Sequence, residues 1–107
     1  MTRTIGTVEQ QRIRHTVAFR LRHAAGSPEE AAFLAEAESL AASPGVEDFE
    51  VLRQVGAKND FADGISMEFA DQAAYDAYNG HPAHVRFVDE RWLPEVAEFL
   101  EIDYAER

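Results

Sequence analysis

The sequence predicts an α+β domain with the ferredoxin-like order β-α-β-β-α-(α)-β and a four-stranded antiparallel sheet. Four segments alternate between apolar and polar residues with the period of two that is typical of strands. One segment with helical spacing separates the first two strands, and two more separate the last two. The chain has 107 residues, of which 46% are hydrophobic, and this size and composition suit a single domain.

The first strand is predicted over residues 13–22, after a polar segment without periodicity at 1–11. That segment is expected to be a flexible arm, so the domain spans residues 12–107. Alternation gives the strand one face rich in arginine and one apolar face with a single histidine. The apolar face holds Ile13, His15, Val17, Phe19 and Leu21.

A helix is predicted to begin at Pro28, because Ser27 and Glu30 have the spacing of a capping box. Its apolar stripe includes Phe33, and the Pro-Gly pair at 44–45 ends it. Two alternating segments joined by a polar turn follow the helix. They predict strands at 46–56 and 61–69.

Two helices and a strand are predicted in the last third of the chain. Asp71 is expected to cap a helix over residues 72–80, in which Tyr75 and Tyr78 lie on one side because they are three apart. A second helix is expected to begin at Pro82 and to end at Pro94. The final strand, residues 96–104, places Phe99, Glu101 and Asp103 on one face and Leu100, Ile102 and Tyr104 on the other.

Composition excludes several classes of protein. The net charge of −10 argues against nucleic-acid binding, which needs a basic face. No apolar run approaches the ~20 residues that span a bilayer, so membrane insertion is not expected. The chain has no cysteine, which excludes disulfides and thiolate chemistry and is typical of a cytoplasmic protein.

The predicted sheet has apolar side chains on both faces. In this fold the helices cover one face only, so the other face needs a partner. Leu52, Leu100 and Ile102 lie opposite the apolar residues of the covered face. A large exposed apolar patch is unusual on a monomer, and we therefore expect a homodimer that packs sheet against sheet.

Four stretches together resemble one known family, the stress-responsive dimeric α/β-barrel (Dabb) domain. They are "IRHTVAFRLR", "ISMEFADQAAYDAY", "HPAHVRFV" and "EIDY", and the resemblance covers about residues 12–105. It implies a dimeric α+β barrel in which two four-stranded sheets pack together with the helices outside. Most members have no established activity, and a plant member is a polyketide cyclase that performs an aldol condensation without a cofactor.

The resemblance also implies a site. The histidine that acts as the base in the plant cyclase corresponds to His84, and its tyrosine corresponds to Tyr78. A histidine of the first strand corresponds to His15, and the aspartate that orients the base corresponds to Asp103. Two positions depart from the cyclase: Asp63 replaces a histidine, and Glu101 replaces an apolar lining residue. Because a carboxylate disfavours a long alkyl tail, the same substrate is not expected.

The residue types alone are compatible with this acid–base chemistry and also with a purely structural interpretation. A histidine oriented by a carboxylate can act as a general base, and a tyrosine can stabilise an oxyanion. His84 could equally cap a backbone carbonyl or pair with Asp103 for structural reasons, and His15 could be a satisfied core residue. Val17, Phe19 and Phe33 are expected to line or support the pocket, as are Asp63 and Glu101.

No metal or cofactor is expected. His81 and His84 are three apart and are followed by Asp89 and Glu90, which are possible ligands of a divalent ion. The proline between the histidines and the lack of a clear third inward ligand argue against such a site. No glycine-rich phosphate loop or nucleophile elbow is present.

The leading hypothesis is therefore a homodimer that binds a small apolar carbonyl compound. If the protein is an enzyme, its chemistry is cofactor-independent acid–base chemistry of the cyclase or aldol type. Two alternatives stay open. One is a non-enzymatic, stress-related oligomeric protein. The other is a cofactor-free monooxygenase, because small monooxygenases share the dimeric α+β barrel architecture. An open cavity beside His84 and Tyr78 would favour an enzyme or binding protein over the non-enzymatic alternative.

Overall fold

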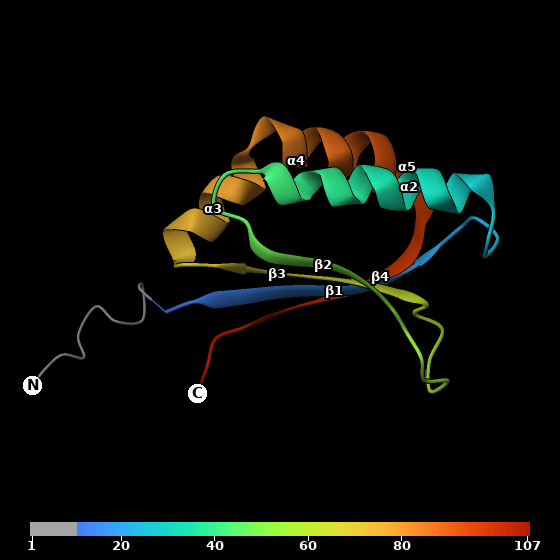
Figure 1. Ribbon diagram of the computed structural model, residues 1–107, viewed down its shortest axis with the longest axis horizontal. Coiled ribbons are helices and arrows are strands. Elements are labelled where there is room, and N and C mark those ends of the chain that lie inside the picture. The colour runs from blue at the N-terminus through green and yellow to red at the C-terminus, as the bar shows by residue number, and fades with distance from the viewer. Residues whose placement is uncertain (1–10) are drawn as a thin grey trace, which may run out of the picture.

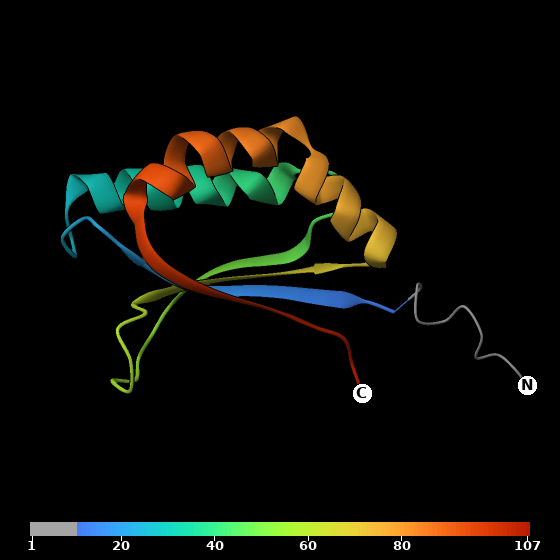
Figure 2. The ribbon, with the colours of Figure 1, turned by 180° about the vertical axis from the view of Figure 1, so that it is seen from behind.

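The computed structural model describes residues 11–107 and has two layers, with the helices on one face of a single sheet (Figures 1 and 2). The predicted N-terminal arm, residues 1–11, lies outside the described residues except for Gln11. The sheet has the order β2-β3-β1-β4, and each neighbouring pair is antiparallel. Its strands are β1 (Ile13–Leu21), β2 (Glu47–Arg53), β3 (Asp63–Phe69) and β4 (Val96–Tyr104). The predicted ferredoxin-like fold is confirmed.

The first helix, α2 (Pro28–Glu38), begins as the capping box predicts. Ser27 Oγ accepts a hydrogen bond from the Glu30 amide at 3.1 Å. The Glu30 carboxylate accepts from the Gly26 amide at 2.8 Å, so the reciprocal bond reaches one residue further back than expected. The helix continues as the 3₁₀ turn η1 (Ser39–Ala42).

Strand β2 is shorter than predicted, because the segment after it folds on itself. The side-chain amide of Gln54 donates to Asn59 Oδ1 at 2.9 Å and also to the Phe61 carbonyl. These bonds close the loop between β2 and β3. The backbone from 54 to 62 therefore belongs to the loop and not to the two strands.

The last helical region passes through three kinds of helix: α4 (Pro82–Phe87), the π-helical η2 (Val88–Trp92) and α5 (Leu93–Glu95). It follows α3 (Gln72–Gly80), whose predicted bounds are confirmed. Pro94 lies inside the helix instead of ending it. Because proline has no N–H for the Glu90 carbonyl, the preceding widened turn accommodates it, with the Leu93 amide bonded to the Val88 carbonyl.

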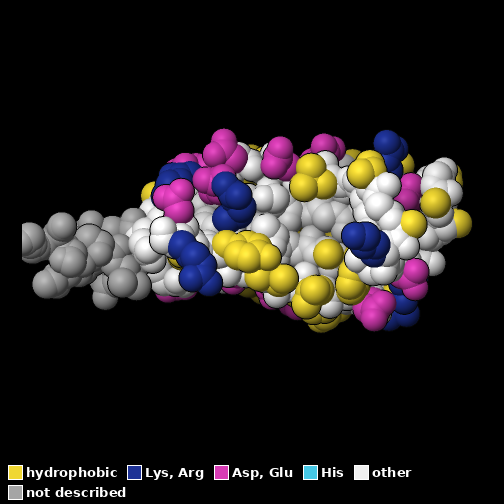
Figure 3. Space-filling view, turned by 90° about the horizontal axis from the view of Figure 1, so that it is seen from below, with side chains coloured by type: hydrophobic (Ala, Val, Ile, Leu, Met, Phe, Trp, Pro, Cys, Tyr) yellow, Lys and Arg dark blue, Asp and Glu magenta, His cyan; other side chains and the backbone are white. Residues whose placement is uncertain are grey.

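The helix-covered face of the sheet carries the core. Within the described part of the chain no helix covers the opposite face, which we call the bare face. The ladder places Leu52, Gly64, Ala18 and Leu100 in one row of the bare face, beside a row with Thr16, Ser66 and Ile102. Figure 3 shows this face, with hydrophobic side chains between charged ones. Four large apolar residues on it are 39–52% exposed: Leu52, Leu100, Ile102 and Tyr104.

Candidate functional site

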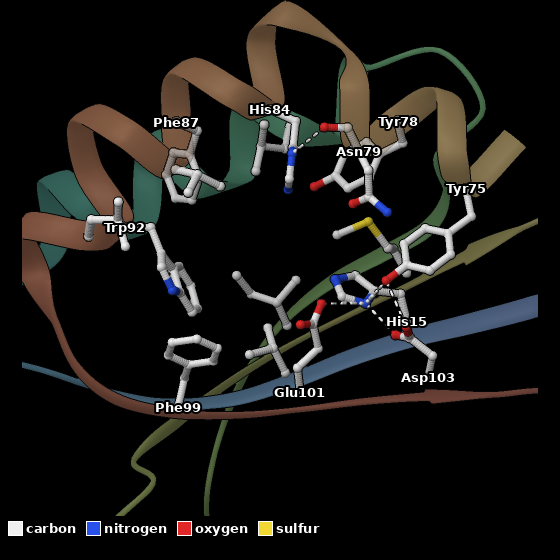
Figure 4. Close-up of a pocket in the computed structure, with 16 residues that line it drawn as sticks. His15, Tyr75, Tyr78, Asn79, His84, Phe87, Trp92, Phe99, Glu101 and Asp103 are labelled. Atoms are coloured by element: carbon white, nitrogen blue, oxygen red, sulfur yellow. Dashed lines mark hydrogen bonds and ion pairs between the residues drawn. The ribbon is translucent and has the colours of Figure 1, made fainter.

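A cavity of about 450 Å³ lies between the helices and one half of the sheet (Figure 4). Strands β1, β3 and β4 form its floor, and α3, α4 and η2 form its roof. Polar side chains gather at one end, and apolar ones line the rest. The polar end consists of His15, Tyr75, Tyr78, Asn79, His84, Glu101 and Asp103. The apolar part includes Val17, Ile65, Met67, Phe87, Trp92 and Phe99.

His15 and Asp103 form a carboxylate–histidine pair on the floor. They face each other across the β1–β4 ladder, and His15 Nδ1 lies 2.6 Å from Asp103 Oδ1. Because a carboxylate only accepts, Nδ1 carries the proton and donates it. Nε2 of the buried ring is then the atom that faces the cavity.

Tyr75 completes this pair from helix α3. Its hydroxyl donates to Asp103 Oδ2 at 2.8 Å and lies 3.0 Å from His15 Nδ1. Burial, together with the negative charge of Asp103, raises the pKa of Tyr75 well above its usual range. The tyrosine is therefore protonated at neutral pH and serves to hold the carboxylate. The sequence places Tyr75 on the same side of the helix as Tyr78 and predicts no function in the site for it.

His84 faces the cavity from the roof. Its Nδ1 lies 3.1 Å from the carbonyl oxygen of Asn79, which can only accept, so Nδ1 carries the proton. Nε2 is left as an unprotonated base that points into the cavity (Figure 4). Burial lowers the pKa of His84 below its ordinary 6.5, and charge on His15 adds to this. The ring is neutral at pH 7.

The expected pairing of His84 with Asp103 is wrong. Asp103 contacts His15 and Tyr75, whereas the Asn79 carbonyl orients His84. The reason is geometric, since β4 pairs with β1 and its Asp103 is directly opposite His15, on the floor. The structural interpretation of His84 predicted a bond to a backbone carbonyl. His84 makes this bond and also lines the cavity.

Tyr78 lies directly beside His84. The two ring centroids are 4.5 Å apart, and the Tyr78 hydroxyl faces the cavity (Figure 4). Burial, with a smaller effect from the charge of Glu101, raises the pKa of Tyr78 above its usual range. The Tyr78 hydroxyl therefore stays protonated at neutral pH and can donate a hydrogen bond beside the neutral ring of His84.

Three residues expected at the pocket lie outside its lining. Phe19 and Phe33 are completely buried and pack against each other, with ring centroids 5.9 Å apart, in the core. Asp63 begins β3 opposite Phe19, away from the polar end, and burial followed by the charge of Glu30 raises its pKa. Val17 and Glu101 line the cavity as expected.

One cluster of described residues has the composition of a metal site. The ligand atoms of His15, Glu101 and Asp103 lie within 4.8 Å of one another. A metal ion at Nδ1 would have to displace the proton shared with Asp103. His81, considered as a ligand from the sequence, instead caps α4 by accepting from the Ala83 amide at 3.1 Å.

Sequence reasoning missed Tyr75, Asn79, Trp92 and Phe99 as parts of the site. Tyr75 and Phe99 have a usable signal, because each shares a face with a predicted site residue of the same element. Asn79 acts through its backbone carbonyl, which no side-chain pattern reveals. Trp92 reaches the cavity through the π-helical turn, where it meets Phe99 edge to face at 5.5 Å.

The fold and the site define a ferredoxin-like α+β protein with a cavity of small-molecule size under its helices. The chain belongs to the stress responsive A/B barrel domain (Dabb) family, whose model matches residues 13–106. The predicted resemblance is confirmed. No curated protein matches the sequence. Within residues 11–107, no helix has both the length and the apolar character needed to cross a membrane.

Solved structures agree with this assignment. A Dabb family protein with a ferredoxin-like fold from Mesorhizobium loti is 57% identical, with a TM-score of 0.90 over 92% of this chain and 99% of that one. A dimeric ferredoxin-like protein of unknown function from Thermobifida fusca is 19% identical, with a TM-score of 0.76 over 92% and 93%. The hydroxynitrile lyase from Passiflora edulis is 15% identical, with a TM-score of 0.80 over 92% and 95%. The last two show a shared fold only.

Proposed function

We propose that the protein binds a small, largely apolar carbonyl compound in the cavity and transforms it by acid–base chemistry without a cofactor. The observation that carries this proposal is the neutral His84 ring, whose free Nε2 faces the cavity beside the Tyr78 hydroxyl. A neutral base and a neighbouring O–H donor are two groups that promote enolate formation.

The reaction would proceed as follows. Nε2 of His84 takes the proton from a carbon next to the carbonyl group, and the Tyr78 hydroxyl donates a hydrogen bond to the enolate oxygen. The enolate carbon then forms a bond with a second carbonyl carbon. The oxygen of that carbonyl receives the proton from His84, which restores the neutral ring. His15, held by Asp103, has its own Nε2 available for a polar group of the ligand.

The open cavity also bears on the alternatives. A cavity of about 450 Å³ bordered by His84 and Tyr78 favours a binding protein or an enzyme over a protein with only an oligomeric role. A cofactor-free monooxygenase would use the same base, and oxygen uptake distinguishes it. The hydroxynitrile lyase of Passiflora edulis is an example of an enzyme with this fold.

We also propose that the functional unit is a homodimer. The bare face carries four large exposed apolar residues from the two edge strands, with small side chains from the central strands between them. A second copy of this face would cover them, because a two-fold interface is self-complementary. The Thermobifida fusca protein, which shares the fold, is described as dimeric.

Proton exchange at carbon tests the chemistry directly. Phenylacetone has acidic protons next to its carbonyl and is small enough for the cavity. We expect the protein to accelerate loss of these protons in D₂O, followed by proton NMR, and we expect His84→Gln to reduce the protein-dependent rate by roughly 10²-fold or more. Binding, followed through the fluorescence of Trp92, is expected to persist in this variant. Exchange that His84→Gln leaves unchanged contradicts the proposal.

A further inference from the structure

One wall of the cavity carries negative charge, which the proposed acid–base chemistry does not require. Glu101 extends from β4 into the cavity, between Phe99 and His15 (Figure 4). Its Oε2 lies 3.5 Å from His15 Nδ1, and its side chain is 49% exposed. Asp103 lies two residues further along the same face of the strand, so two carboxylates line one wall.

No cation balances these carboxylates. None of the described residues that line the cavity is a lysine or an arginine. The only basic groups in the lining are two imidazoles, and burial lowers the pKa of His84, which keeps it neutral. If His15 is neutral, the wall carries two negative charges, and if His15 is protonated against Asp103, the charge of Glu101 remains. The wall is negative in both states.

Aromatic rings stand beside this charge. Phe99 precedes Glu101 by two residues on the same strand face, and Trp92 meets Phe99 at 5.5 Å. An organic ammonium group is attracted both by a carboxylate and by the faces of such rings. An anionic ligand would meet repulsion at the same place, because the carboxylates leave this wall with a net negative charge.

We propose that the ligand of this cavity carries a protonated amine, which binds Glu101, and an apolar body, which lies against Trp92 and Phe99. This inference rests on the proposed function and narrows its substrate class to amine-bearing carbonyl compounds. Glu101 is then a specificity-determining residue, whereas His84 and Tyr78 perform the chemistry at the carbonyl end.

Three probes of equal length test the inference: phenylbutylamine, phenylbutanol and phenylbutyrate. Trp92 is the only tryptophan of the chain, so its fluorescence reports binding in the cavity. We expect the amine to bind roughly fivefold more tightly than the alcohol, the fold-change of a partly exposed ion pair, and the carboxylate to bind more weakly than the alcohol. The preference is expected to shrink with added salt.

Two variants of equal charge provide the control. Glu101→Gln is expected to remove the advantage of the amine over the alcohol. Glu98→Gln removes one negative charge from the same strand but on the bare face, where Glu98 pairs with Arg20 at 3.5 Å, and is expected to keep the advantage. Each titration is performed with and without EDTA, to test whether a bound metal ion produces the preference.

The outcomes separate this inference from the proposed function. If the carboxylate or the alcohol binds as tightly as the amine, or if Glu101→Gln keeps the preference, the inference is wrong while proton exchange at carbon stands. A preference that disappears in EDTA also overturns it. If none of the probes changes the fluorescence up to their solubility limits, the inference is also wrong, and proton exchange at carbon remains the test of the proposed function.

Discussion

At the scale of single residues, the two histidines of the cavity differ in how their protons are held. Asp103 fixes the proton of His15, and a backbone carbonyl fixes that of His84. Burial favours the imidazole form of His84, so its Nε2 is unprotonated and available as a base at neutral pH. Both rings direct Nε2 to the same space.

The lowered pKa of His84 predicts a pH dependence. The unfolded chain takes up a proton at this histidine near pH 6.5, before the folded protein does, so the free energy of unfolding falls as the pH drops through and below that value. Proton exchange at carbon is expected to lose its rate only below pH 6.5. NMR titration of the ring measures the midpoint, and the His84→Asn variant should lack this part of the stability profile. A midpoint at or above 6.5 contradicts the assignment.

Phenylalanine variants of Tyr75 and Tyr78 distinguish a structural hydroxyl group from a proposed catalytic one. Tyr75→Phe removes the donor to Asp103 and is expected to lower the free energy of unfolding by about 1 kcal/mol, measured by urea unfolding. Tyr78→Phe removes the proposed oxyanion donor and is expected to reduce proton exchange at carbon while changing stability by less than ~0.5 kcal/mol. Equal losses of stability in both variants would place the Tyr78 hydroxyl among the structural groups.

At the scale of elements, strand register decides which side chains meet. The β1–β4 ladder sets His15 opposite Asp103 and Val17 opposite Glu101. A shift of β4 by one residue would move Glu101 and Asp103 to the bare face, away from His15 and Val17. Helix α3 supplies Tyr75, Tyr78 and the Asn79 carbonyl, so the position of this one short helix orients both histidines.

The N-terminal cap of α3 is therefore expected to stabilise the helix that orients both histidines. Asp71 Oδ1 accepts a hydrogen bond from the Ala74 amide at 2.8 Å. Asp71→Ala should lower the free energy of unfolding by about 1 kcal/mol, because the amide loses its partner, and Asp71→Asn should recover most of the loss. Urea unfolding measures both variants. If the alanine variant is as stable as the asparagine variant, the cap does not hold the helix.

At the scale of the whole molecule, the two faces of the sheet have different functions. One face holds the core and the cavity, whereas the other has small central residues and an apolar margin on which no helix or strand of residues 11–107 packs. The charges Glu101 and Asp103 lie on the cavity face, and Ile102 between them lies on the bare face. The same strand thus contributes to the proposed ligand site and to the proposed dimer interface.

The dimer predicts different behaviour for two apolar-to-charged variants. Ile102→Asp places a carboxylate in the apolar margin of the proposed interface and is expected to yield a monomer at micromolar concentration in sedimentation experiments. Val55→Asp changes a residue that is 94% exposed in the loop after β2, and it should leave the dimer intact. A wild-type protein that sediments as a monomer at micromolar concentration would refute the dimer.

Local patterns determine much of the fold. Alternation of residue types places every strand, because a period of two is maintained wherever one face is buried. Side-chain caps at Ser27 and Asp71 determine where α2 and α3 begin. The ends of the loop after β2 are less predictable, because side-chain hydrogen bonds from Gln54 determine them. The helical conformation around Pro94 is also less predictable, because it depends on a π-helical turn.

By itself, the sequence determined the order of the elements, the family and the candidate residues His84, Tyr78, His15, Glu101 and Asp103, because residue identity and spacing carry that information. Only the tertiary structure decided which of them pair. Asp103 belongs to His15, since hydrogen bonds between strands bring residues 88 positions apart into contact. The proton of His84 is fixed by a backbone carbonyl, which every residue possesses and which no sequence pattern distinguishes.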